Sequence, residues 1–303
     1  MRIPLGIAPC SWGIEDIANK DNPSWERVMD EASMTGFSGI ELGPYGFFPT
    51  EASRLKGILA SKNLTLTAGT LYDDLSEAAD REYLLNKTRS ICSLLSQVEQ
   101  KKGFLVVIDA VKGDRDLTAG HPTLAKRLGA KGWKALMDNV TQIALVARDE
   151  FGIRAVVHPH AGGYIEYQDE TEWFLHDIPD SLAGLCLDTG HLYYAGSDPS
   201  ESLVRFQSRL DYVHFKDIDK GVYEKALAGN LGFFDACKNQ VMCSIGRGCL
   251  DYASIFTTLE TIGYRTWVTV EQERDPLDTG GTLSDLRSSH AFLVDAMGGP
   301  SIR

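Results

Sequence analysis

Short apolar runs rich in β-branched residues alternate along this chain with longer segments of helical periodicity. Eight such runs predict strands, at Ile3–Pro9, Gly39–Leu42, Leu64–Ala68, Phe104–Asp109, Ile153–His158, Ala183–Asp188, Leu210–Phe215 and Thr266–Glu271. The intervening segments predict helices, at Ser24–Thr35, Thr50–Ser61, Arg81–Gln100, Trp133–Glu150, Glu170–His176, Pro199–Ser208, Tyr252–Ile262 and Leu283–Ala296. Strand and helix therefore alternate from one end of the chain to the other.

This alternation favours one fold class. Continuous apolar runs such as Phe104–Asp109 are typical of strands buried on both faces, and strand–helix alternation requires parallel strands with right-handed crossovers. Eight such units favour a closed (β/α)8 TIM barrel over an open sheet. No Gly-Ser or Pro-rich linker divides the chain, so we expect a single barrel domain over residues 1–303. Two longer loops, Lys112–Lys131 and Lys220–Gly248, follow the fourth and seventh strands on the side where barrels keep their sites.

The composition of the chain argues against nucleic acid and membranes as partners. With 30 Lys and Arg against 42 Asp and Glu, the net charge of −12 argues against nucleic acid. No apolar run approaches the roughly 20 residues that span a bilayer, and the N-terminus lacks a secretory pattern, so we expect no membrane association and a cytoplasmic location. The 6 cysteines include no CxxC pair, which indicates buried thiols in a reducing compartment.

Four of the predicted strands end in residues that bind metals in proteins. Strands five to eight end, in order, in His158, Asp188, His214 and Glu271. Because strand ends converge on one rim of a barrel, these side chains are predicted to meet there. Two imidazoles and two carboxylates suit Mn²⁺, Co²⁺, Fe²⁺ or Zn²⁺ better than Mg²⁺ or Ca²⁺. The alternative is a set of structural histidines and of N-caps for the helices that follow.

Further polar and aromatic residues lie close to the predicted strand ends. Their types suit substrate contacts, proton transfer or the orientation of ligands, and they are Trp12, Glu41, His160, His191, Lys216, Glu273 and Arg274. If the fifth strand continues past Pro159, His160 shares a face with the last residue of that strand. Lys216 can instead form a structural ion pair with Asp217 at the rim. Trp12 suits a platform for a sugar ring and core packing equally well.

The sequence lacks the motifs of phosphate-binding loops and of serine or cysteine nucleophiles. The glycines have neither the GxGxxG nor the GxxxxGK spacing of phosphate-binding loops, and no GxSxG elbow is present. No cysteine has the sequence context of a nucleophile. The strand-end residues therefore carry the functional prediction.

These motifs resemble those of the xylose-isomerase-like TIM-barrel superfamily of sugar isomerases, epimerases and dehydratases. The resemblance runs nearly end to end and rests on Ile7-Ala-Pro-Cys-Ser-Trp-Gly13, Gly36-Phe-Ser-Gly-Ile-Glu41, His158-Pro-His160, Leu187-Asp-Thr-Gly-His-Leu-Tyr-Tyr-Ala-Gly196, Val213-His-Phe-Lys-Asp217 and Val270-Glu-Gln-Glu-Arg-Asp-Pro276. Within the superfamily the chain most resembles the inosose dehydratases. The ketose epimerases have a glutamate at the end of strand five, where this chain has His158, so a two-carboxylate epimerase is disfavoured.

The resemblance implies a hydro-lyase that removes water from a cyclic polyol ketone such as 2-keto-myo-inositol. A divalent ion, Mn²⁺ or Co²⁺ before Zn²⁺ or Fe²⁺, would be held by the four strand-end residues and would stabilise the enolate that forms when the α-proton leaves. The base would be Glu271, Glu273 or His160, and His191 would protonate the leaving hydroxyl. The residues expected to contact the substrate are Trp12, Glu41, Lys216 and Arg274.

Three alternative functions stay open at this point. They are a metal-dependent keto-sugar isomerase or epimerase, a lyase for a 3-keto-sugar, and a sugar-binding regulatory barrel without catalysis. Barrels of this superfamily often associate, so a homo-oligomer is a further expectation. The long loop Lys220–Gly248 would then either cover the site or form an interface.

Overall fold

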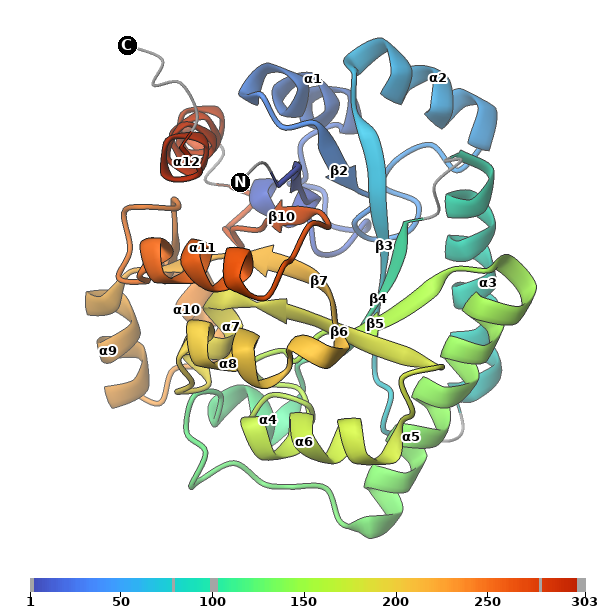
Figure 1. Ribbon diagram of the computed structural model, residues 1–303, viewed down its shortest axis with the longest axis vertical. Coiled ribbons are helices and arrows are strands. Elements are labelled where there is room, and N and C mark those ends of the chain that lie inside the picture. The colour runs from blue at the N-terminus through green and yellow to red at the C-terminus, as the bar shows by residue number, and fades with distance from the viewer. Residues whose placement is uncertain (1–2, 78–79, 99–102, 278–279, 299–303) are drawn as a thin grey trace.

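A computed structural model describes residues 3–77, 80–98, 103–277 and 280–298 of the protein. Within these residues, eight parallel strands close into a barrel in chain order, with helices around it (Figure 1). The barrel strands are β1 (Leu5–Ile7), β2 (Gly39–Glu41), β3 (Thr65–Asp73), β4 (Phe104–Asp109), β5 (Arg154–Val157), β6 (Ala183–Asp188), β7 (Leu210–Phe215) and β10 (Val268–Val270). The predicted (β/α)8 TIM barrel is confirmed.

The helices that surround the barrel lie close to their predicted positions. They are α1 (Trp25–Thr35), α2 (Ala52–Lys62), α3 (Arg81–Val98), α5 (Ala130–Leu145), α6 (Gln168–Asp177), α8 (Pro199–Arg205), α11 (Tyr252–Thr261) and α12 (Thr282–Ala296). A π-helical turn at Val146–Glu150 continues α5 to the end of the predicted helix. The last two residues of the predicted segment Arg81–Gln100 lie outside the described residues. Among the helices described, none is both long and apolar enough to cross a bilayer.

Several strands end one or more residues from their predicted carboxyl ends, and the differences in β3 and β5 bear on the site. β3 runs past its predicted end at Ala68 and stays paired with β4 as far as Asp73, which lies opposite Asp109. Its outer half mixes polar and apolar residues, so it lacks the continuous apolar run that marks the other strands. β5 ends at Val157 and does not continue past Pro159, because proline has no N–H to donate to a strand ladder.

Both predicted long loops contain short elements. The first holds α4 (Gly113–Leu117), and the second holds α9 (Lys220–Ala228), α10 (Phe233–Lys238) and β9 (Met242–Cys243). β9 pairs antiparallel with β8 (Asp217–Ile218), and α7 (Thr189–Tyr194) follows β6 directly. A hydrophobic cluster that includes Tyr194, Ile218 and Phe233 packs these pieces together. Elements this short give too few turns for a helical period to appear in the sequence.

The inside of the barrel explains how the strand-end residues come together. A buried cluster drawn from adjacent strands consists of Ala68, Val106, Ile108, Val156, Cys186 and Tyr212. Side chains two positions apart along a strand share a face. His158, Asp188 and His214, two positions beyond the last three cluster members, therefore lie above this cluster at the carboxyl rim. The register of β6 and β7 also places Asp188 directly opposite His214.

Candidate active site

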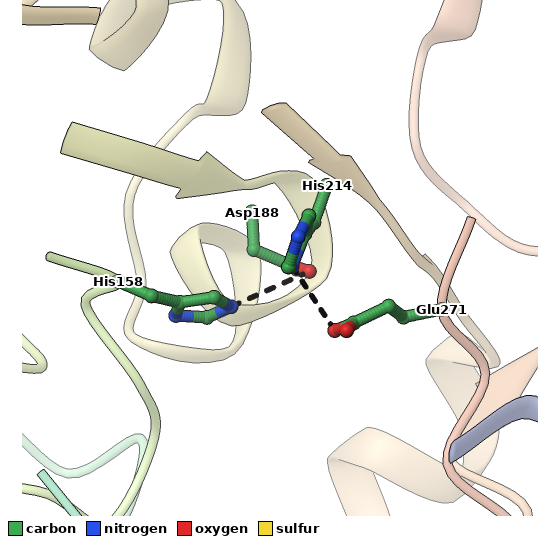
Figure 2. Close-up of side chains that lie close together, drawn as sticks. All are labelled: His158, Asp188, His214 and Glu271. Carbon is green, nitrogen blue, oxygen red and sulfur yellow. Dashed lines mark ion pairs between the residues drawn. The ribbon is translucent and has the colours of Figure 1, made fainter. Parts of the chain in front are cut away.

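His158, Asp188, His214 and Glu271 face one another at the carboxyl rim of the barrel (Figure 2). Each offers one nitrogen or oxygen atom, and these four atoms lie within 4.8 Å of one another. His158 Nε2 lies 3.8 Å from Asp188 Oδ2, and His214 Nδ1 lies 3.2 Å from Glu271 Oε2. The structure thus brings all four predicted residues together, and their role as metal ligands stays a prediction.

Each histidine of this cluster has one ring nitrogen held by an acceptor outside it. His158 Nδ1 donates to Pro159 O at 2.9 Å, and His214 Nε2 donates to Glu41 Oε1 at 2.9 Å. In a neutral ring the opposite nitrogen then carries a lone pair and no proton. These opposite atoms, His158 Nε2 and His214 Nδ1, are buried without a hydrogen-bond partner and face the carboxylates. This is the arrangement that a metal-binding histidine requires.

Protonation of His214 is coupled to cation binding. Burial opposes a positive charge on this ring, but the negative charges around it, including Glu271 and Glu41, raise the pKa of His214 well above its usual value. A cation that binds Nδ1 must therefore release a proton there.

Lys216 lies fully buried among the carboxylates of the site. Its ammonium lies 2.8 Å from Asp188 Oδ2 and 3.1 Å from Glu273 Oε1, and it also contacts Glu271. Burial opposes its charge, but these carboxylates hold the pKa of Lys216 well above its usual value. Conversely, burial would raise the pKa of Asp188, but Lys216 and the neighbouring histidines hold it well below its usual value. Together with Glu41, the carboxylates outnumber this one ammonium, and the surplus of negative charge suits a cation.

The alternative role for Lys216, an ion pair with Asp217, is not what the structure shows. The Asp217 carboxylate accepts hydrogen bonds from the backbone N–H groups of Ile218, Gly246, Gly248 and Leu250, at 2.8–3.1 Å. It therefore ties together the two ends of the Lys220–Gly248 loop, while Lys216 points into the barrel.

Asp188 caps a helix with one carboxylate oxygen and keeps the other within the predicted metal site. Its Oδ1 accepts from the N–H groups of Gly190 and His191 at 2.8 and 2.9 Å, which caps α7. Its Oδ2 stays directed at Lys216 and His158. A Cβ atom at Gly190 would lie 2.5 Å from the Cβ of Lys216, so α7 can start this close to β7 only with glycine at that position.

A second group, formed by His160, His191 and Glu273, adjoins the first. Its nitrogen and oxygen atoms also lie within 4.8 Å of one another, and the two rings are 3.9 Å apart between centroids. His191 Nε2 lies 3.5 Å from Glu273 Oε1. The structure thus places His160 beside the metal-ligand candidates although β5 does not continue to it.

The backbone of Ala161 determines which ring nitrogen carries the proton in each histidine, and the result differs between the two rings. His160 Nδ1 donates to the carbonyl oxygen of Ala161 at 2.8 Å, which leaves a lone pair on His160 Nε2. The N–H of Ala161 donates to His191 Nδ1 at 3.1 Å, so the proton of a neutral His191 ring is on Nε2. Burial, together with the positive charges nearby, holds the pKa of both rings well below the usual value, which keeps both neutral.

A cavity of about 580 Å³ opens onto these groups, and His160, Glu271 and Glu273 form part of its wall. The sequence prediction missed Glu15, which lines the cavity from the loop after β1. No sequence signal marks Glu15, because only the convergence of loops brings it here.

The loop Lys220–Gly248 covers one side of the site. The ring of Phe233, at the start of α10, lies 5.3 Å from the ring of His160 and 5.2 Å from that of His191. Phe234 lines the cavity itself. Of the two roles expected for this loop, covering the site is the one that the structure supports.

The four predicted substrate contacts do not line the cavity. Trp12 is fully buried in the core, and its Nε1 donates to Glu31 at 2.7 Å, so core packing is the correct alternative for it. Arg274 is held by Asp285 of α12 at 3.2 Å. Glu41 lies beneath the site as the acceptor for His214. These side chains are occupied by the protein itself, and Lys216 is likewise enclosed by carboxylates.

Comparison with known proteins agrees with this fold. A family model described as xylose isomerase-like TIM barrel matches residues 29–295. An inosose dehydratase of Clostridium beijerinckii is 28% identical over 284 residues, which cover 91% of both chains. The rhizopine catabolism protein MocC of Rhizobium meliloti is 30% identical over 282 residues, 91% of this chain and 83% of that one.

Among solved structures, the IolI protein with a bound zinc atom has a TM-score of 0.73 at 14% identity, over 98% of each chain, which is a likeness of fold. The expected resemblance to the inosose dehydratases is confirmed by curated relatives of that name. The protein belongs to the xylose isomerase-like TIM-barrel family.

Proposed function

We propose that this protein is a metal-dependent dehydratase that removes water from a cyclic polyol ketone, with 2-keto-myo-inositol as the first substrate to test. Similarity over about nine-tenths of the chain to proteins named inosose dehydratase supports a hydro-lyase. The observation that carries the proposal is the convergence of two ring nitrogens, His158 Nε2 and His214 Nδ1, with the carboxylates of Asp188 and Glu271.

The four-residue cluster fits a divalent cation in its donor types, in two ring nitrogens that have no other hydrogen-bond partner, and in its negative surroundings. A mixed set of nitrogen and oxygen donors suits Mn²⁺ or Co²⁺, with Zn²⁺ or Fe²⁺ as alternatives. A cation bound there would draw charge from the substrate carbonyl and so make the neighbouring C–H bond more acidic.

His160 is the base in this proposal. Its Nδ1 proton is committed to Ala161, burial keeps the ring neutral, and the ring lies in the wall of the cavity. Its Nε2 lone pair therefore takes the α-proton of the substrate. Glu271 and Glu273 are weaker candidates, because both contact the ammonium of Lys216.

His191 is the acid. Its Nε2 carries the proton because its Nδ1 accepts from the backbone of Ala161. As the C–H bond breaks toward His160, a C=C bond forms, the C–O bond breaks, and the leaving hydroxyl takes the His191 proton to depart as water. His160 then holds one proton more and His191 one fewer. The adjacent rings and Glu273 offer a path to restore the starting state.

The test is to load the protein with Mn²⁺ or Co²⁺, supply 2-keto-myo-inositol, and measure both bound metal and loss of water. We expect dehydration that stops when a chelator removes the metal. Absence of water loss with either metal would refute the substrate assignment. Exchange of the α-hydrogen with solvent without any dehydration would instead identify an isomerase or epimerase.

A further inference from the structure

The cavity has an outer part whose chemistry differs from that of its floor. We call this outer part the vestibule, and it consists of Ile17, Pro44, Tyr45, Tyr83 and Phe234. These residues come from the loops after β1 and β2, from α3 and from α10. Ile17 and Tyr83 are 53% and 56% exposed. Large apolar side chains grouped at the mouth of a site mark a surface that binds something apolar.

The volume of the cavity exceeds what one hydroxylated ring needs. At about 580 Å³ it falls within the range of roughly 300–1,000 Å³ found for sites that enclose drug-sized ligands. A ring that is hydroxylated on every side would occupy the floor, beside His160, Glu271 and Glu273. Hydroxyl groups pressed against Ile17, Pro44 and Phe234 or against the faces of the two tyrosine rings would lose their bonds to water without replacement.

The charges of the lining exclude an anionic substituent. Glu15, Asp16, Glu271 and Glu273 line the cavity. Among the described lining residues, Lys87 is the one lysine or arginine, and it lies 2.8 Å from Asp73 Oδ2. A phosphate or carboxylate on the substrate would therefore meet repulsion without a free cation to offset it.

We propose that the substrate is an uncharged cyclic polyol ketone that carries one apolar alkyl or aryl group on a ring oxygen. The ketone ring lies on the floor of the cavity, and the apolar group packs against the vestibule. The assignment of the ring rests on the proposed function, whereas the assignment of the substituent rests on the vestibule. The two can therefore fail separately.

The experiment compares three kinds of ligand on the metal-loaded protein by calorimetry and by turnover. They are 2-keto-myo-inositol, its mono-O-benzyl ethers and its monophosphate. We expect at least one benzyl ether to bind about tenfold more tightly than the plain ring, since burial of apolar surface contributes roughly 25 cal/mol per Å². The monophosphate should bind more weakly than the plain ring.

Surface variants of the vestibule provide the matched test. Tyr83→Ala and Ile17→Ser should return the affinity for the ether to that of the plain ring, and leave affinity for the plain ring unchanged. Leu124→Ser is the control, because Leu124 is 62% exposed and does not line the cavity.

The other possible outcomes test the assignment of the ring and the assignment of the substituent separately. Equal binding of ether and plain ring, or tighter binding of the monophosphate, would overturn the vestibule proposal even if the plain ring is dehydrated. Tight binding of an ether without dehydration of any ligand would support the vestibule and refute the dehydratase. If Tyr83→Ala or Ile17→Ser converts an oligomer to a monomer in sedimentation, the vestibule is an interface between copies and the proposal fails.

Discussion

His214 Nε2 lies 2.9 Å from Oε1 of Glu41, a residue 173 positions earlier in the chain. The same oxygen accepts from the Tyr212 hydroxyl at 2.8 Å, and Glu41 is fully buried. Glu41 is therefore a positioning residue. It holds His214 through Nε2 and so orients the ring with Nδ1 facing Glu271, 3.2 Å away.

Removal of a ligand should abolish tight binding of the metal. We expect His214→Ala to weaken Mn²⁺ or Co²⁺ binding by more than about 100-fold, beyond the usual effect of losing an outer partner of a ligand. Equilibrium dialysis followed by metal analysis measures this change. His176→Ala is the control, because that side chain lies on α6 and is 87% exposed. Metal binding by His214→Ala equal to that of the parent would show that the ligand assignment is wrong.

Glu41→Gln separates a positioning role from a substrate contact. We expect affinity for the metal to fall by about 10- to 100-fold, because the amide holds the His214 ring less firmly than the carboxylate does. The absorption spectrum of the Co²⁺ form should shift as well. Tyr212→Phe keeps the bond between Glu41 and His214 and should change metal affinity less. An increase in KM with unchanged metal affinity and spectrum would favour the substrate role instead.

Substitution of the histidines proposed as base and acid should abolish different steps of the reaction. In D₂O, His191→Gln should still exchange the α-hydrogen of the substrate but lose dehydration by about 10²- to 10⁴-fold. His160→Gln should lose both exchange and dehydration. NMR of the substrate follows the exchange, and product formation follows the dehydration. The opposite pattern would reverse the assignment of acid and base.

A buried carboxyl outside the site should make stability depend on pH. Glu166 is buried beside Arg115, and burial raises the pKa of its carboxyl to about 7 despite the guanidinium 3.2 Å away. Between the ordinary pKa of about 4.5 and about 7, the folded protein thus binds more protons here than the unfolded chain, so stability falls as pH rises through this window. The loss from this one group is at most about 3 kcal/mol.

Glu166→Gln cannot ionise, so this part of the decline should be absent from it. Urea unfolding of parent and variant at about pH 5 and about pH 8 measures the difference, which should grow in favour of the variant as pH rises. Glu172→Gln is the control, because Glu172 is 46% exposed. A difference between parent and Glu166→Gln that stays constant with pH would contradict the prediction.

The sequence predicts the residues at a strand end, or directly after it, better than those several positions beyond it. Alternation along a strand decides which face a side chain takes, and this rule leads correctly to His158, Asp188 and His214. Trp12 lies beyond β1 in a 3-10 turn, where strand alternation no longer applies, and its side chain turns into the core. Arg274 likewise lies beyond β10, and its partner Asp285 belongs to another element.

Other parts of the site depend on contacts between distant segments. Glu15, Phe234 and the pair of hydrogen bonds at Ala161 follow from how loops pack, which local patterns do not encode. The short elements α9 and α10 are hidden in the sequence for the same reason, because tertiary contacts stabilise them more than their own helical propensity does.

The hydrogen bonds of Asp217 make the Lys220–Gly248 loop, which covers the site, a unit that can be exchanged. Since one carboxylate holds amides at both ends of the Lys220–Gly248 loop, the chain between those ends can change in length and sequence without moving β7 or the residues beneath it. Exchange of this loop among related barrels should then alter which substituents are accepted while the chemistry at the barrel rim stays the same.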